Sequence, residues 1–181
     1  MDYTQIRSAR KTLSVAISPN GEVIVRAPNR MPKRDIQRFL ESKQDWIVHH
    51  RSRLPEPAPK LTESELRELV RHAKEVLPEI AAWYAPKVGV GYGRITIRTQ
   101  HTRWGSCSEQ GNLNFNCLLM LMPDDVMEYV VVHELCHRKE MNHSPRFWAE
   151  VERILPGYRQ SRRWLKENGG ALIARLSCCF Y

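Results

Sequence analysis

The eleven residues from His133 to His143 constrain this chain more than any other part of its sequence. They begin with the pattern H-E-x-x-H, which places His133 and His137 four residues apart. Residues at that spacing lie one turn apart on the same face of a helix, so both imidazoles can bind one ion. His143 lies too far along a straight helix to reach that ion, and we therefore expect the chain to turn after about Lys139 or Glu140. Three neutral imidazoles would leave the fourth position of a zinc ion open for water.

Glu134 directly follows the first histidine, and its carboxylate could reach a water molecule held by the same ion. The three specified positions arise by chance in roughly 2% of random chains of this length. A core helix could also carry His133 and His137 as buried, hydrogen-bonded histidines. Such a helix would have less reason to carry Glu134 between them and His143 just beyond a turn. The sequence therefore favours one zinc ion per chain, with Glu134 as the catalytic group.

The composition sets broad limits on the kind of protein. The hydrophobic share is 42% and the charged share 27%, both ordinary for a soluble globular protein of 181 residues. No apolar run approaches the length of a membrane span, and the first residues contain no apolar leader. The five cysteines are odd in number and have no disulfide-framework spacing. These features predict a cytoplasmic protein with reduced cysteines and no membrane partner.

The net charge of +8 raises the question of nucleic acid. The surplus lies mainly in residues 1–60, which hold 12 Lys/Arg against 6 Asp/Glu, whereas residues 103–181 hold 10 against 9. No aromatic residues alternate with these basic residues, so a solvated surface is the simpler interpretation. We expect at most weak nucleic-acid contact through the basic N-terminal part.

The N-terminal part is predicted to be a β-hairpin followed by a helix, together forming a lead over residues 1–54. Residues 12–18 and 22–27 alternate apolar and polar side chains, and Pro19-Asn20-Gly21 between them favours a hairpin turn. Apolar residues then recur at helical spacing from Ile36 to Ile47, which predicts a helix to about His50. The proline-rich residues 55–60 are predicted to be a linker.

Residues 61–170 are predicted to form the catalytic domain. A helix should begin at a Thr62–Glu65 capping box and be kinked or interrupted at Pro78. The segments 94–100 and 113–120 are predicted strands, paired antiparallel. Ser144 and Pro145 favour a helix start, and a last short helix should stop at Asn168-Gly169-Gly170. The tail, residues 171–181, has no predicted function.

Three segments together point to a known family. They are the loop Arg103-Trp104-Gly105-Ser106-Cys107, the strand Leu113-Asn114-Phe115-Asn116, and the stretch from His133 to Trp148. With these segments the chain resembles the YgjP-like metallopeptidases, which are relatives of the SprT and Spartan zinc peptidases. The resemblance implies an α+β, zincin-like metallopeptidase domain. It also implies that His133, His137 and His143 bind zinc and that Glu134 is catalytic. The metzincins share the ligand spacing, but Glu140 stands where they have glycine, so that assignment is rejected.

The function expected from these features is hydrolysis of peptide bonds in a peptide or protein substrate. A zinc-activated water would attack, with Glu134 as general base. Tyr158, His101 and Arg103 are candidates for a second group that stabilises the oxyanion. Two alternatives remain open. One is a nucleic-acid-associated SprT-like module that processes DNA-bound proteins, and the other is a zinc-dependent hydrolase of a non-protein amide.

Overall fold

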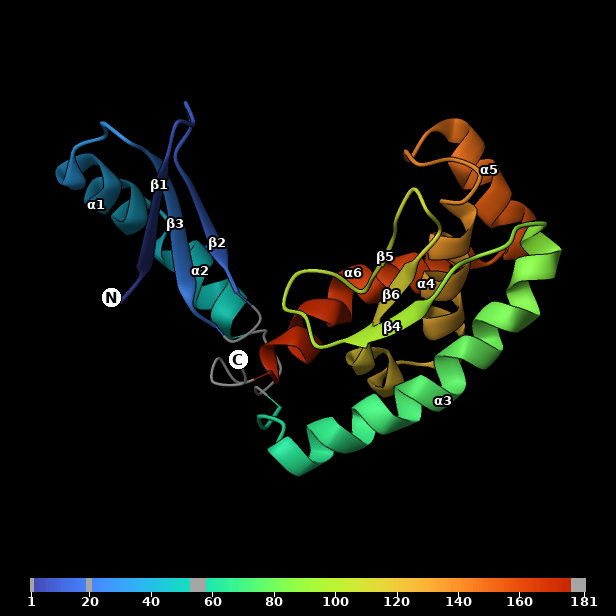
Figure 1. Ribbon diagram of the computed structural model, residues 1–181. Coiled ribbons are helices and arrows are strands. Elements are labelled where there is room, and N and C mark those ends of the chain that lie inside the picture. The colour runs from blue at the N-terminus through green and yellow to red at the C-terminus, as the bar shows by residue number, and fades with distance from the viewer. Residues whose placement is uncertain (1, 19–20, 53–57, 177–181) are drawn as a thin grey trace. The chain divides into compact units, whose positions relative to one another are not determined.

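The computed structural model describes residues 2–18, 21–52 and 58–176, and the chain falls into two compact units (Figure 1). The first unit is Met1–Pro59 and the second is Lys60–Tyr181. Each unit has a hydrophobic core of its own, because the buried apolar side chains form two separate clusters. The three histidines of the predicted metal site all belong to the second unit.

The first unit contains a three-stranded sheet in the order β1-β3-β2. Its strands are β1 (Thr4–Ser8), β2 (Ser14–Ile17) and β3 (Val23–Pro28). β2 and β3 are antiparallel, with Val15 opposite Val25, as the predicted hairpin requires. Pro19 and Asn20 of the predicted turn lie outside the described residues. β1 pairs with β3 in parallel and was not predicted, because its sequence TQIRS contains a single apolar residue.

Two helices, α1 (Lys33–Ser42) and α2 (Gln44–Arg51), follow where one helix was predicted. The break is at Lys43, whose φ of −110° and ψ of 7° interrupt the helical backbone. The apolar periodicity hid this break, because Leu40 and Ile47 on either side enter the same core. The core consists of Val23, Val25, Ala27, Ile36, Leu40 and Ile47. Residues 55–57 of the predicted linker lie outside the described residues.

The second unit begins with the long helix α3 (Glu63–Val88). Thr62 and Glu65 form the predicted capping box, with the Thr62 side chain accepting from the Glu65 N–H. The predicted interruption at Pro78 is wrong, because α3 continues through it. Leu77 and Ala81 flank the proline and are fully buried. Their packing offsets the hydrogen bond that proline cannot donate, a loss of about 3 kcal/mol within a helix.

The sheet of the second unit has the order β4-β6-β5. Its strands are β4 (Ile95–Arg98), β5 (Gly105–Cys107) and β6 (Leu113–Asn116). The predicted antiparallel pairing of the two longer strands is wrong: β4 and β6 are parallel, and the short strand β5 is the antiparallel partner of β6. β6 also ends earlier than predicted, because the Asn116 side chain accepts from the Leu118 N–H and starts the 3₁₀ helix η1 (Cys117–Leu121).

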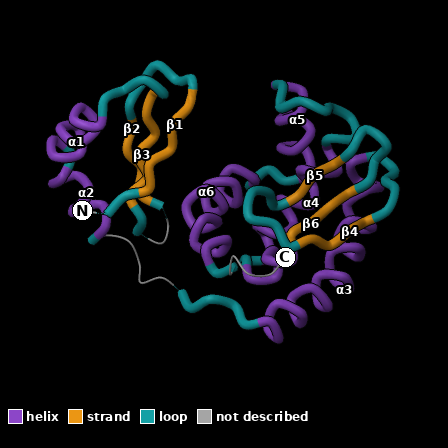
Figure 2. Tube along the Cα trace, turned by 60° about the vertical axis from the view of Figure 1, so that its left-hand side comes forward, coloured by secondary structure: helices purple, strands orange, loops and turns teal. Residues whose placement is uncertain are grey.

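Helix α4 (Asp124–Cys136) lies at the centre of the second unit, in contact with α3, α5, α6 and β5 (Figure 2). Two further helices complete the unit, α5 (Pro145–Ile154) and α6 (Tyr158–Ala174). Most residues of α4 are buried, including the run Tyr129 to Val132 that leads to the first histidine. The architecture is of the α+β class that was predicted. No helix among the described residues is long and apolar enough to cross a membrane.

Helix α6 does not stop at Asn168-Gly169-Gly170, as the sequence predicted, but runs to Ala174. Gly169 is buried inside the helix, and a Cβ built there would lie 3.0 Å from Cζ2 of Trp104. The glycine therefore provides room for an indole ring and does not end the helix. The chain beyond it also belongs to the core: Leu176 is buried, and the Leu61 N–H donates to the Arg175 carbonyl at 2.9 Å.

Candidate metal centre

The last turn of α4 and the loop after it supply the three histidines. α4 ends at Cys136, and His137 is its C-terminal cap. The Lys139 and Glu140 N–H groups then both donate to the Cys136 carbonyl, at 3.0 and 3.1 Å. The chain thus leaves the helix somewhat earlier than the sequence predicted. This early exit leaves room for residues 138–142 to fold back and place His143 near the two helical histidines.

Side-chain contacts fix the segment between the second and third histidines. Arg138 donates to the carbonyl oxygens of Gly91 and Glu109, at 3.1 and 2.9 Å. Lys139 forms a 3.0 Å ion pair with Glu150 on α5. Both cations thus bridge to neighbouring segments.

The start of α5 fixes His143. Ser144 is the N-cap and its hydroxyl accepts from the Phe147 N–H at 3.3 Å, while Pro145 is the first helical residue, as predicted. The Asn142 side chain accepts from the Ser144 N–H at 3.0 Å, which closes the turn before the helix. Phe147 is fully buried and anchors α5 in the core. Hydrogen bonds before and after Ser144 therefore hold the backbone of the helix start that directly follows His143.

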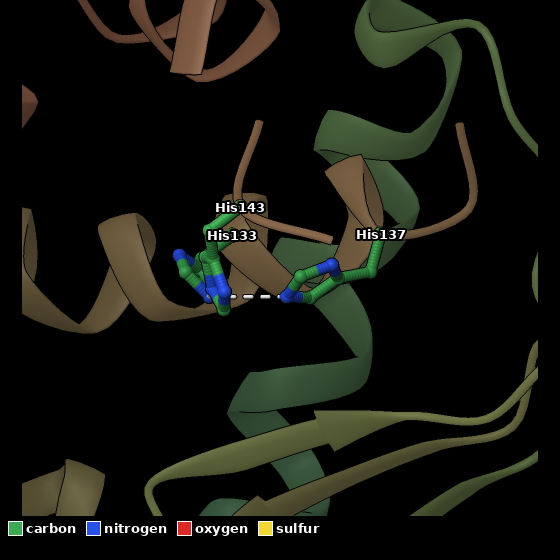
Figure 3. Close-up of side chains that lie close together, drawn as sticks. All are labelled: His133, His137 and His143. Carbon is green, nitrogen blue, oxygen red and sulfur yellow. Dashed lines mark hydrogen bonds between the residues drawn. The ribbon is translucent and has the colours of Figure 1, made fainter. Parts of the chain in front are cut away.

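The three imidazoles converge on one point (Figure 3). Nε2 of His133 lies 3.2 Å from Nε2 of His137 and 3.0 Å from Nε2 of His143. Three nitrogens bound to tetrahedral zinc at about 2.05 Å would lie roughly 3.3 Å from one another. Both distances from His133 are within a few tenths of an ångström of this value, and the three ligand atoms all lie within 4.8 Å of one another.

Hydrogen bonding and aromatic packing orient the imidazoles. Nδ1 of His137 lies 2.9 Å from the Glu140 carbonyl, so it carries the proton and Nε2 is left with its lone pair for a metal. The Phe147 ring contacts all three imidazoles, with ring centroids 4.5–4.9 Å apart. Trp148 stacks on both His143 and Tyr158. These rings hold the histidines in place independently of an ion.

The surroundings keep the helical histidines neutral. Burial, and then the neighbouring His137 and His143 because like charges repel, lower the pKa of His133 to about 3. Burial also lowers the pKa of His137 below its ordinary value. A neutral imidazole is the form that binds a metal ion, since protonation occupies the lone pair. The donor set therefore fits a divalent metal that accepts nitrogen ligands.

Glu134 lies beside this cluster in an unusually dry environment for a carboxyl group. Its exposed fraction is 6%, and burial raises its pKa to about 8, although the nearby Arg103 guanidinium acts in the opposite direction. Strand β5 reaches it closely, since a Cβ built on Gly105 would lie 2.7 Å from Glu134 Oε1. Only glycine allows the strand to approach the carboxyl group this closely.

A recess of about 280 Å³ opens over the cluster and holds all four predicted site residues. It is lined by Arg103, Gly105, Ser106, Cys107, His133, Glu134, His137, Met141 and His143. Of the three candidates for a second oxyanion group, Arg103 lines this recess. Tyr158 is buried between Tyr129 and Trp148, and His101 lines a neighbouring cavity.

The protein-family model described as "YgjP-like, metallopeptidase domain" matches residues 11–70 and 55–168 of the chain. The chain belongs to the YgjP-like metallopeptidase family. It is therefore a metallopeptidase, whose substrates are peptides or proteins.

Solved structures of metallopeptidase zymogens are similar to part of this YgjP-like chain. It is similar to the metallopeptidase zymogen abylysin of Pyrococcus abyssi, with 22% identity, a TM-score of 0.46, and 51% of this chain and 94% of that chain covered. The metallopeptidase zymogen jannalysin of Methanocaldococcus jannaschii is similar at 19% identity and a TM-score of 0.44, with the same coverage. No curated protein matches the chain.

Some residues that shape the site of this YgjP-like protein were not recognised as functional from sequence. Gly105, Phe147 and Trp148 were seen only as parts of the segments that carry the family resemblance. Asn116 was seen as a strand residue, yet it is 1% exposed and donates to the carbonyl oxygens of Gln100 and Arg103. The only available signal was a polar residue at the end of a buried strand. That pattern does not indicate which loop the residue binds.

Proposed function

We propose that this metallopeptidase binds one zinc ion through His133, His137 and His143 and hydrolyses peptide bonds with Glu134 as general base. The convergence of the three Nε2 atoms supports the ligand set most directly. Zinc is the metal that best matches three neutral imidazoles with one open position. Neither the family match nor a contact of the described residues supports nucleic-acid binding by the basic N-terminal part.

Each group of the site would have a separate role in the reaction. When bound, zinc supplies a Lewis acid that polarises the scissile carbonyl and lowers the pKa of water from ~15.7 towards ~7. Glu134 would accept the proton of the attacking water and deliver it to the leaving amine. Its burial, with 6% of the residue exposed, suits this role because bulk water competes little for the proton. The Arg103 guanidinium, which lines the recess, would stabilise the negative charge that develops on the carbonyl oxygen.

Strand β5 offers a place for the substrate backbone. It is the last strand in the order β4-β6-β5, so one of its edges has no partner strand among the described residues. All three of its residues line the recess that contains Glu134. An extended peptide could bind there by main-chain hydrogen bonds and present its scissile bond to Glu134.

Metal analysis and a cleavage assay on the full chain test this proposal. The purified protein should contain about one zinc per chain, cleave members of a broad peptide library, and lose cleavage when a chelator removes the metal. His143→Ala should weaken zinc binding greatly. His72→Ala is the matched control, because His72 is an exposed histidine on α3 away from the cluster. Zinc content unchanged in the His143 variant, or no cleavage by the zinc-loaded parent, would refute the proposal.

A further inference from the structure

A second cavity, of about 600 Å³, lies beside the metal recess in the same unit. It is lined by Arg98, Thr99, Gln100, His101, Thr102, Arg103, Ser106 and Asn114. These residues come from the end of β4, from β5 and β6, and from the loop that joins β4 to β5. Every lining residue is polar or charged, and none of them is a carboxylate.

The polar lining follows from how the sheet is built. Side chains two residues apart on a strand point to the same face, and paired residues share that face. Ile97 and its partner Phe115 belong to the core on one face. Arg98 and Asn114 each lie one residue along their strands from that pair, so their side chains point to the opposite face. Ser106 of β5 pairs with Asn114 and shares this face. The cavity therefore lies on the side of the sheet away from the hydrophobic core.

Asn116 gives the cavity a fixed wall. Its side-chain amide donates to the Gln100 carbonyl at 2.7 Å and to the Arg103 carbonyl at 3.0 Å. Its own oxygen accepts from the Leu118 N–H at 3.1 Å, so the amide is held on both sides. Because Asn116 is almost fully buried, it holds the 100–103 loop from inside the protein.

The charges of the cavity are not neutralised. Neither Arg98 nor Arg103 forms an ion pair within the parts of the chain that the structure describes. Other arginines of this unit, such as Arg71 and Arg153, lie against glutamates. The carboxylate that acts on Arg103 is Glu134, which lies in the metal recess. Two guanidinium groups around a polar cavity form a typical site for a carboxylate, to which each can donate two hydrogen bonds.

The cavity adjoins the place where the reaction would occur, since Arg103 and Ser106 line both the cavity and the metal recess. A peptide bound along β5 would thus pass from one to the other. We propose that this cavity binds the carboxylate of an acidic residue near the scissile bond, so that the enzyme prefers acidic peptides. This inference rests on the proposed peptidase function. A nucleic acid fits less well, because no Phe, Tyr or Trp lines the cavity to stack on a base and the His101 imidazole is the single ring in its lining.

The test compares matched peptides with the zinc-loaded full chain. In one cleaved library peptide, glutamate is moved through the three positions on each side of the scissile bond, with glutamine as the neutral replacement. At one position kcat/KM should be about tenfold higher for glutamate than for glutamine, the ratio expected for one charge-assisted hydrogen bond. The ratio should fall as salt is raised, because salt screens exposed charges.

Arg98→Gln removes one cation from the cavity and leaves the residues of the metal recess in place. The glutamate-to-glutamine ratio should fall towards one in this variant. Arg94→Gln is the matched control, because Arg94 is exposed just before the same strand and does not line the cavity. It loses the same charge and should keep the parent's ratio. A loss of general stability would change kcat/KM for both peptides together and leave the ratio unchanged.

The outcomes separate this inference from the proposed function. Equal cleavage of glutamate and glutamine peptides at every position would overturn the acidic preference and leave the peptidase proposal standing. An unchanged ratio in Arg98→Gln would overturn the assignment to this cavity. A single-stranded oligonucleotide that displaces the glutamate peptide from the parent but not from Arg98→Gln would assign the cavity to phosphates. No cleavage of any peptide would overturn both proposals.

Discussion

The backbone of Gly105 lies so close to Glu134 that a Cβ on the glycine would be 2.7 Å from the carboxylate oxygen Oε1 and 2.7 Å from Cγ. Strand β5 and helix α4 therefore contact each other where Gly105 of the strand lies against Glu134 of the helix, the proposed general base. A side chain at this position must displace either the strand or the carboxyl group.

Gly105→Ala should lower kcat/KM by at least about tenfold, because Glu134 must move from its place beside the metal ligands. The protein should still fold and bind zinc, since the three atoms nearest to the new methyl group all belong to Glu134 and none to a proposed zinc ligand. Gly91→Ala is the matched control, because no atom lies within 4 Å of a Cβ built there. The measurements are steady-state cleavage, zinc content and circular dichroism. Parent-level activity in Gly105→Ala would show that the close contact is unimportant.

Glu134→Gln keeps the size of the side chain and removes its basic oxygen. If Glu134 accepts the proton of water, the variant should retain zinc and lose hydrolysis by at least ~10², the usual contribution of general-base catalysis. Cleavage and metal content should be measured on the same preparation. Loss of zinc together with activity would make Glu134 a residue that supports the ligands, and full activity would contradict the mechanism.

The sequence predicted those parts of the site that depend on local spacing. His133 and His137 are one helical turn apart, and Ser144 and Pro145 start a helix by local hydrogen bonding, so neither needed tertiary information. The contact of Gly105 with Glu134 joins positions far apart in the sequence. No local pattern indicates it.

The relative direction of β4 and β6 was predicted wrongly for a similar reason. The apolar alternation of Ile95 and Ile97 is the same in a parallel and in an antiparallel pair, so the pattern could not specify which one forms. The end of α6 was misjudged because glycine usually ends helices, whereas Gly169 is required by the Trp104 ring packed against it. In both cases long-range packing decided between two outcomes that local chemistry allowed.

The two neighbouring glycines of α6 should respond differently to alanine. Gly170 is exposed, and Gly170→Ala should raise the free energy of unfolding by about 0.5–1 kcal/mol through helix propensity. Gly169→Ala gains the same propensity but places a methyl group 3.0 Å from the Trp104 ring. We expect Gly169→Ala to be less stable than the parent in urea unfolding. Equal stabilisation by both changes would mean that the indole moves aside without cost.

The ion pairs of Glu150 predict a pH-dependent contribution to stability. Arg153 and then Lys139 hold the pKa of Glu150 below its ordinary value. A carboxyl group whose pKa is lowered in the folded protein stabilises the fold at pH values above its ordinary pKa. This contribution is lost as the pH falls through the lowered pKa. Glu150→Gln should therefore reduce the free energy of unfolding at pH 7 by about 0.5 kcal/mol, a small effect because the partners are partly exposed.

The difference between Glu150→Gln and the parent should disappear in acid. Urea unfolding at neutral pH and at several acidic values measures it, with Glu167→Gln, an exposed glutamate on α6, as the control. A difference that stays constant at all pH values would come from lost packing and not from the charge of Glu150.

The hydrogen bond between the Leu61 N–H and the Arg175 carbonyl joins the first and last described segments of the second unit. The peptidase unit is therefore a closed loop of chain whose entry and exit lie side by side. Such a unit tolerates new termini elsewhere, because a short connection can join the old ones. Opening the chain in an exposed loop and linking residue 176 to residue 60 should give a circular permutant with the same metal centre. The closed ends also make the unit transplantable: inserted into a surface loop of another protein, it would need little added linker.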